Sequence, residues 1–230
     1  MLKAFGLGAI AQSSLLLAGL LVFWVTVPRR VVGIMAGFGA GALLAAVSFD
    51  LIAETEGLDE GELGLWMLVG VAVFLVGDRI VERRFGNEGT GGAMGIVVGS
   101  VVDGVPESII FGIQLATGLP VSASFLAAVL ISNVPQAIAP SADLAAAGWG
   151  VRRLGRLWLL VVLACGVAAA LGYAGANASG DITGARMAAL AAGGLLAMMT
   201  NSLMPFAYER GGEFAGLATV VGFCLAIGGT

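Results

Sequence analysis

Long apolar stretches separated by short polar loops run through the whole sequence. Several exceed about 18 residues, which is enough for one helix to cross the hydrocarbon core of a bilayer. Hydrophobic residues make up 59% of the 230 residues, whereas only 11% are charged. A soluble domain of this size does not have that composition. The chain is therefore predicted to be an all-α integral membrane protein, with the lipid bilayer as its surroundings.

Eight transmembrane helices are expected, and together they form a single transmembrane domain over residues 1–230. Nine of the eleven basic residues lie in or beside alternate loops, while Lys3 and Arg186 lie on the other side. The positive-inside rule then makes both termini extracytoplasmic. The short cytoplasmic loops account for the arginines, so no nucleic-acid partner is expected. The expected spans cover residues 5–27, 31–53, 64–83, 93–117, 122–147, 156–177, 184–206 and 212–229.

An internal repeat relates the two ends of the chain. Gly41-Ala-Leu-Leu-Ala45 matches Gly193-Gly-Leu-Leu-Ala197 at an offset of 152 residues, and the same offset carries Gly70 onto Gly222. Because the matching spans cross in opposite directions, the pattern predicts an inverted repeat, as in many secondary transporters. The predicted arrangement is 3+2+3, with a three-helix repeat over 5–90, a central pair over 91–148 and a second repeat over 149–230.

The central pair carries prolines and polar groups halfway along its helices, over residues 99–145. Asp103 and Glu107 are one helical turn apart and share a face. A carboxylate at the bilayer centre costs roughly 2.5–3.5 kcal/mol, so the pair needs a compensating partner. Pro106 and Pro135 each leave a backbone carbonyl without its helical donor, and oxygen atoms gathered at one depth suit a divalent cation. The predicted metal ligands are Asp103, Glu107, Ser132, Asn133, Gln136 and Asp143.

Most of these residues also have a purely structural interpretation. Asp103 and Glu107 could form a buried pair that is neutralised by protons or by amides. The polar side chains of the second helix could instead join helices through hydrogen bonds. Asp143 could pair with Arg152 or Arg153 rather than bind metal on the cytoplasmic side.

Other groups outside the central motifs allow different interpretations. Asp50 and Glu54 fit a solvated helix end at the outer side of the second span. The acidic second loop fits either a solvated loop or an electrostatic funnel for cations. Cys165 and Cys224 match no metal or disulfide pattern and are expected to be packing residues.

The predicted topology and two motifs resemble the ZIP (zinc- and iron-regulated transporter-like) family of divalent-metal transporters. Asp103-Gly-Val-Pro-Glu-Ser108 is similar to that family's His-Asn-x-Pro-Glu-Gly, and Ser132-Asn-Val-Pro-Gln136 is similar to its fifth-span motif. The resemblance implies a main metal site on Asp103, Glu107, Ser132 and Gln136.

Several departures from the family pattern imply that a second, adjacent metal site is lost. Gly104 stands where the family has an amide, Gln136 replaces a carboxylate, and the sixth span has no acidic residue. The segment 82–92 lacks the family's histidines, because the chain contains none.

The resemblance implies a secondary carrier of the cell membrane that works by alternating access. Spans one, four, five and six would move against spans two, three, seven and eight, with uptake toward the cytoplasm, and a homodimer is allowed. The cargo would be a divalent ion of the zinc, manganese, iron or magnesium class, and the absence of histidine favours the harder ions. No resident cofactor and no enzymatic activity are expected. The alternative is a degenerate, non-transporting homologue that acts as an ion sensor or binding protein.

Overall fold

A computed structural model describes residues 1–85, 91–118, 121–179 and 181–228. All the regular secondary structure in these ranges is helical. Two π-helical segments, Val47–Leu51 and Met199–Leu203, and a 3₁₀ turn, Ala53–Thr55, extend α2 and α7. The α-helices are α1 (Leu2–Leu21), α2 (Arg29–Ala46), α3 (Glu60–Phe85), α4 (Gly91–Thr117), α5 (Ala123–Ala146), α6 (Val151–Ser179), α7 (Asp181–Met198), α8 (Met204–Gly211) and α9 (Glu213–Gly228).

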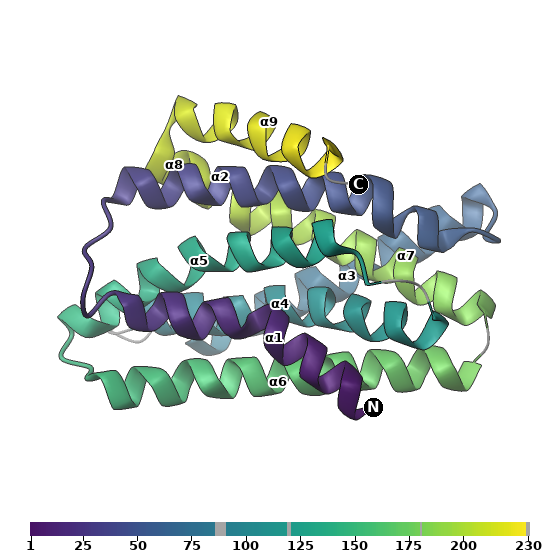
Figure 1. Cartoon of the computed structure of the whole chain (residues 1–230), viewed down its shortest axis with the longest axis horizontal. Helices are drawn as coiled ribbons and strands as arrows, with labels where there is room; N and C mark the ends of the chain where they lie inside the picture. The colour runs from purple at the N-terminus through teal and green to yellow at the C-terminus, as the bar shows by residue number, and fades with distance from the viewer. Residues whose placement is uncertain (86–90, 119–120, 180, 229–230) are drawn as a thin grey trace.

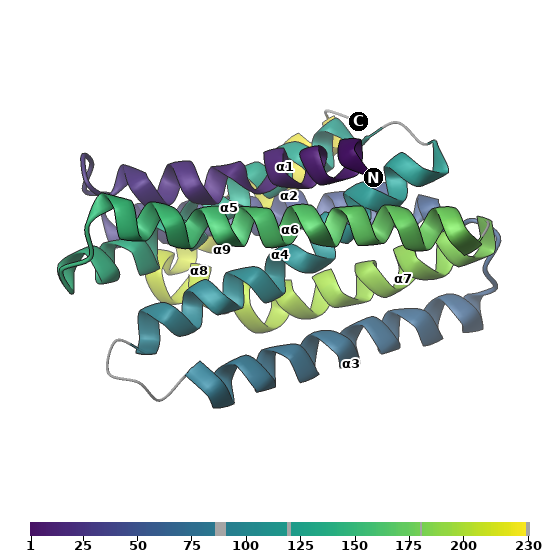
Figure 2. The same ribbon diagram turned by 90° about the horizontal axis from the view of Figure 1, so that it is seen from below.

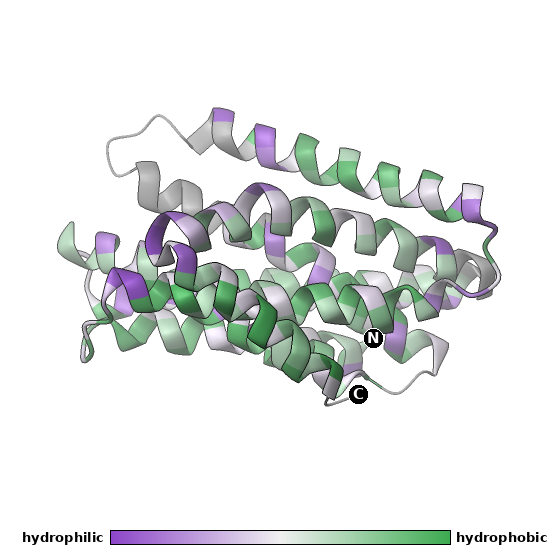
Figure 3. Cartoon of the chain, turned by 90° about the horizontal axis from the view of Figure 1, so that it is seen from above, coloured by the Kyte–Doolittle hydropathy of each residue, from purple (hydrophilic) through white to green (hydrophobic). Residues whose placement is uncertain are grey.

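Six helical segments of the described chain are long and apolar enough to cross a membrane. A helix satisfies its own backbone hydrogen bonds, so it can lie in lipid without unpaired polar groups. Figure 3 shows α3 apolar over its middle and hydrophilic toward both ends. The chain is therefore a helical membrane protein, as its composition predicts. The six segments are Leu2–Leu21, Arg29–Thr55, Glu60–Ile80, Ala123–Ala146, Val151–Ala178 and Gly184–Gly211, and α9 is a shorter apolar helix.

The helices form an elongated bundle in which they run roughly along one axis (Figure 1). The N-terminal end of α1 and the C-terminal end of α9 lie toward the same end of this bundle (Figure 1). Helices α2 and α7 run in opposite directions (Figure 1). Helix α3 lies at the edge of the bundle and packs against α7 (Figure 2).

Glycines bring several pairs of helices into backbone contact. A Cβ at Gly41 of α2 would collide with the carbonyl of Thr219 in α9, and one at Gly222 of α9 would collide with that of Phe38 in α2. The same reciprocal contact joins α3 to α7, where Gly70 faces the carbonyl of Leu190 and Gly193 faces that of Met67. Lipid tails are as apolar as the helix surfaces, so close approach through small residues is what holds such helices together.

The offset of 152 residues that relates the sequence motifs also relates two irregular segments. The π-helical segment Val47–Leu51 follows α2, and Met199–Leu203 follows α7. Adding the offset to the first range gives the second. A π-helical turn is rare and is found mostly at functional sites within longer helices.

Candidate metal site

The two carboxylates of the first central motif lie inside the bundle. Asp103 and Glu107 stand one turn apart on α4, which stays helical through Pro106. Their side chains are 6% and 1% exposed. The two groups are close enough to interact electrostatically. A pair of acids in this position needs hydrogen-bond donors, protons or a cation close by.

Gln12 of α1 links the two central helices. Its Nε2 donates to Oε2 of Glu107 at 2.9 Å, and its Oε1 accepts from Nδ2 of Asn133 at 2.9 Å. Asn133 Nδ2 also reaches the carbonyl of Ala11 at 3.4 Å. Gln12 is fully buried and lies near the middle of its helix, as Glu107 and Asn133 do in theirs. One amide therefore connects α1, α4 and α5 at one level of the bundle. We call Gln12, Asp103, Glu107 and Asn133 the central cluster.

Asp103 faces a different set of neighbours from Glu107. Its Oδ2 accepts a long hydrogen bond of 3.4 Å from Ser202, in the π-helical segment after α7. It also interacts electrostatically with Asp78 of α3. The two carboxylates thus lie on one face of α4 but have different hydrogen-bond partners, Ser202 for Asp103 and Gln12 for Glu107.

Three polar atoms of the central motifs are buried without a hydrogen-bond partner. They are Oε1 of Glu107, Oγ of Ser108 and Nε2 of Gln136, which is 7% exposed. In the part of the chain that the structure describes, no three side chains of His, Cys, Asp or Glu gather closely enough to hold a metal ion. Any cation here would therefore be held by a few carboxylate oxygens together with amide or other donors.

Ser132 and Asp143, which were predicted as ligands, have other contacts in the structure. Ser132 is fully buried, but its hydroxyl donates to the carbonyl of Val129 in its own helix at 3.1 Å. Its backbone packs against Gly39 of α2, where a Cβ would come within 2.6 Å of Ser132 Cα. Asp143 is exposed and interacts electrostatically with Arg210.

A second polar cluster lies where α2 ends. Glu54 Oε1 accepts from Nε2 of Gln114 at 2.6 Å, and Asp50 Oδ2 accepts from the hydroxyls of Ser122 and Ser124 at 2.5 and 2.8 Å. Glu54 Oε2 and Gln114 Oε1 are buried without a partner. The two acids are therefore bonded to α4 and α5 and do not form a solvated helix end. These five residues are called the end cluster below.

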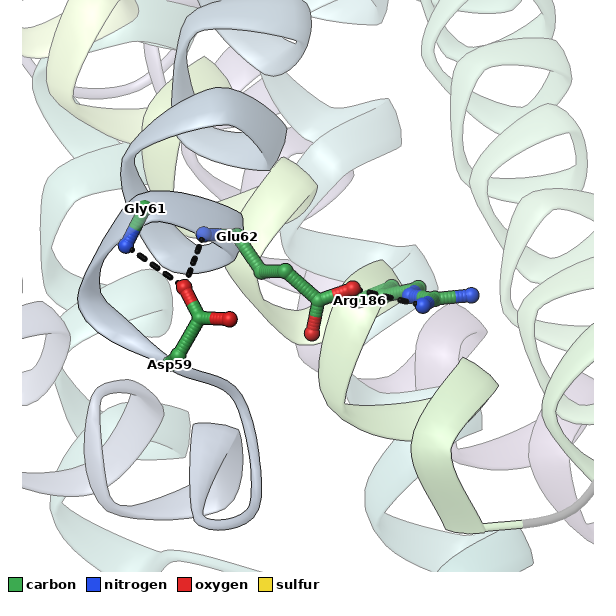
Figure 4. Close-up of polar contacts among 4 residues, drawn as sticks. All are labelled: Asp59, Gly61, Glu62 and Arg186. Carbon is green, nitrogen blue, oxygen red and sulfur yellow. Dashed lines mark hydrogen bonds and ion pairs between the residues drawn. The ribbon is translucent and has the colours of Figure 1, made fainter.

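The acidic loop after α2 has local structural roles (Figure 4). Asp59 Oδ1 accepts from the backbone N–H groups of Gly61 and Glu62 at 2.8 and 2.9 Å, and so caps the first turn of α3. Glu62 forms an ion pair of 2.7 Å with Arg186 of α7, and both side chains are 37% exposed. Asp59 and Glu62 are thus used to start α3 and to tie it to α7.

Sequence reasoning missed Gln12 and Ser202. A usable signal existed for Gln12, because it is an amide near the middle of an apolar span, where polar residues are expensive and need partners. The two proline motifs drew attention to α4 and α5 alone. Ser202 gave no such signal, since a serine can bond within its own helix.

No known protein-family profile matches the chain, and no curated protein is similar enough in sequence to count as a relative.

Proposed function

We propose that this protein is a divalent-metal transporter similar to the ZIP family, with its cargo site at the central cluster. The observation that carries the proposal is the buried pair Asp103 and Glu107, bridged through Gln12 to Asn133. Burying each carboxylate in a membrane costs roughly 2.5–3.5 kcal/mol. Hydrogen bonds between membrane helices contribute only about 0.6 kcal/mol each on average. The bonds from Gln12 and Ser202 therefore offset only a fraction of the cost of an ionised pair, and protons or a bound cation supply the remainder.

The proposed topology has eight spans, arranged 3+2+3 around the central pair, with both termini outside. The offset of 152 residues supports the inverted repeat, because it relates two π-helical segments as well as the sequence motifs. It also maps Gly41 and Gly222, at the contact of α2 with α9, onto Gly193 and Gly70, at the contact of α7 with α3. Helices α2 and α7 run in opposite directions (Figure 1), as an inverted repeat requires.

Many close contacts lie within two sets of helices, which suits alternating access. In the first set, the hydrogen bonds of Gln12 lie among α1, α4 and α5, and reciprocal glycine contacts hold α4 to α6. In the second set, reciprocal glycine contacts hold α2 to α9 and α3 to α7. The first set would move with the cargo, and the second would be the fixed scaffold in the cell membrane.

The end cluster would be a resting point for the ion between the outer solution and the central cluster. It offers two acids, an amide and two hydroxyls, which are oxygen donors of the kind that divalent cations bind. Two of its oxygens are buried without a partner. Asp143, exposed at the other end of α5, would receive the ion on the cytoplasmic side.

A binding protein or sensor that does not transport is the second candidate. It is favoured by the lack, among the described residues, of three clustered acidic, cysteine or histidine side chains. Such a protein would bind a metal without moving it across the membrane.

Reconstitution in liposomes tests the proposal. Uptake of manganese, zinc, cadmium and magnesium would be measured for the wild type, for Glu107→Ala and for the surface control Glu62→Ala. We expect saturable uptake of at least one metal that is lost in Glu107→Ala and retained in Glu62→Ala. Metal binding without uptake by the folded, inserted protein would support the sensor, and uptake that survives Glu107→Ala would overturn the assigned site.

A further inference from the structure

The thiol of Cys165 lies beside the central cluster. Cys165 is fully buried near the middle of α6. A methyl group at Gly104 of α4 would lie 2.9 Å from its Sγ and 3.3 Å from Oε1 of Gln12. The sulfur and the amide oxygen therefore face the same part of α4, and the missing side chain of Gly104 makes room for both.

Glu107 is the third group at this point of the bundle. It interacts electrostatically with the Cys165 thiol, which also lies against Ser108. One carboxylate oxygen of Glu107 is bonded to Gln12, and the other is buried without any partner. A sulfur, an amide oxygen and a glutamate with one unpaired carboxylate oxygen thus lie at one level in the interior of the protein.

We infer that Cys165 is a ligand of the transported metal and that it makes the site select soft or borderline divalent ions such as zinc and cadmium. This inference rests on the proposed transport site. Glu107 and Cys165 would supply the two anionic donors, with Gln12 Oε1 as a neutral one. Coordination replaces the S–H bond of Cys165 by a sulfur–metal bond and releases one proton.

The chemistry of the donors decides which ions are preferred. Thiolate ligands favour zinc and similar ions, whereas carboxylates and carbonyls alone favour magnesium and manganese. A set that includes Cys165 therefore reverses the preference that the absence of histidine suggests. Residue 104, which is an amide position in the ZIP motif, is here the glycine that lets the sulfur approach.

Cadmium absorption in the ultraviolet tests the ligand directly. The purified full-length chain would be titrated with cadmium chloride, and the thiolate-to-cadmium charge-transfer band would be recorded. Cys224 is the only other cysteine in the sequence and is exposed on α9, so Cys224→Ser is the matched control. We expect the band in the wild type and in Cys224→Ser, and its loss in both Cys165→Ser and Cys165→Ala. Absence of the band in the wild type, or its loss only in Cys224→Ser, would overturn the inference.

The ratio of uptake rates separates a ligand from a packing residue. In Cys165→Ser we expect the ratio of zinc to manganese uptake to fall about tenfold, which corresponds to about 1.4 kcal/mol. A cysteine that only packs would change both rates alike, and that result would count against the inference. The outcomes also separate it from transport itself. A Cys165-dependent band without any uptake would support Cys165 as a ligand and overturn the proposed transport. Glu107-dependent uptake without the band would support transport and overturn the role of Cys165.

Discussion

The central cluster and the end cluster use the same kinds of group in different surroundings. In each, a glutamate accepts from a glutamine amide, Glu107 from Gln12 and Glu54 from Gln114. Each glutamate keeps one buried oxygen without a partner. Glu107 is almost completely buried in the middle of α4, whereas Glu54 is half-buried where α2 ends. The two clusters thus share carboxylate and amide groups but differ in burial, and under the proposed function only the central one also has a thiol beside it and selects the ion.

The largest effect is expected when the bridge of the central cluster is removed. Gln12→Leu deletes the bonds to Glu107 and Asn133 but keeps a side chain of similar size. Loss of a group that orients metal ligands typically lowers metal affinity by about 10- to 100-fold. We expect a loss of that size in cadmium affinity, measured by competition with a fluorescent chelator. Gln114→Leu is the matched change in the end cluster, and an equal loss there would remove the distinction between the two clusters.

A smaller effect is expected when the acid of the end cluster is neutralised. Glu54→Gln removes one negative charge from the approach to the central cluster, which lowers the local cation concentration. We expect a half-saturation concentration for uptake that is roughly three- to tenfold higher, with the maximal rate unchanged. The measurement is the initial rate of uptake over a range of metal concentrations, in low and in high salt. A fall in maximal rate with no change in half-saturation would contradict the assigned role.

The smallest effect is expected at the surface ion pair between Glu62 and Arg186. Both side chains are more than a third exposed, so water and salt screen the pair, and its contribution is about 0–1 kcal/mol. We expect Glu62→Gln to leave uptake unchanged and to lower thermal stability only slightly, as read from a melting curve in detergent. A large loss of uptake would show that the acidic loop does more than start α3 and tie it to α7.

Much of the fold could be predicted from the sequence, because long apolar runs in lipid have few alternatives to the helix. The described helices coincide with the stretches expected to be helical, and six helical segments among them are long and apolar enough to cross a membrane. The sequence also identified the buried acids, Asp103 and Glu107, since carboxylates in such runs are rare. It did not identify their partners, because hydrogen bonds between helices depend on rotation and crossing, which apolar periodicity does not specify.

Helix formation, the apolar surface and the depth of the charged groups are thus determined by the sequence alone, because each follows from the cost of placing polar groups in lipid. Only the tertiary structure decided that Gln12 bridges two helices, that Ser132 bonds within its own helix and that Glu54 is tied to Gln114. It also decided that Cys165 lies beside Gly104, although the two residues belong to different helices and lie far apart in the sequence. The physical reason is that glycine and alanine surfaces fit one another in several registers, and the register observed is fixed by many close contacts acting together.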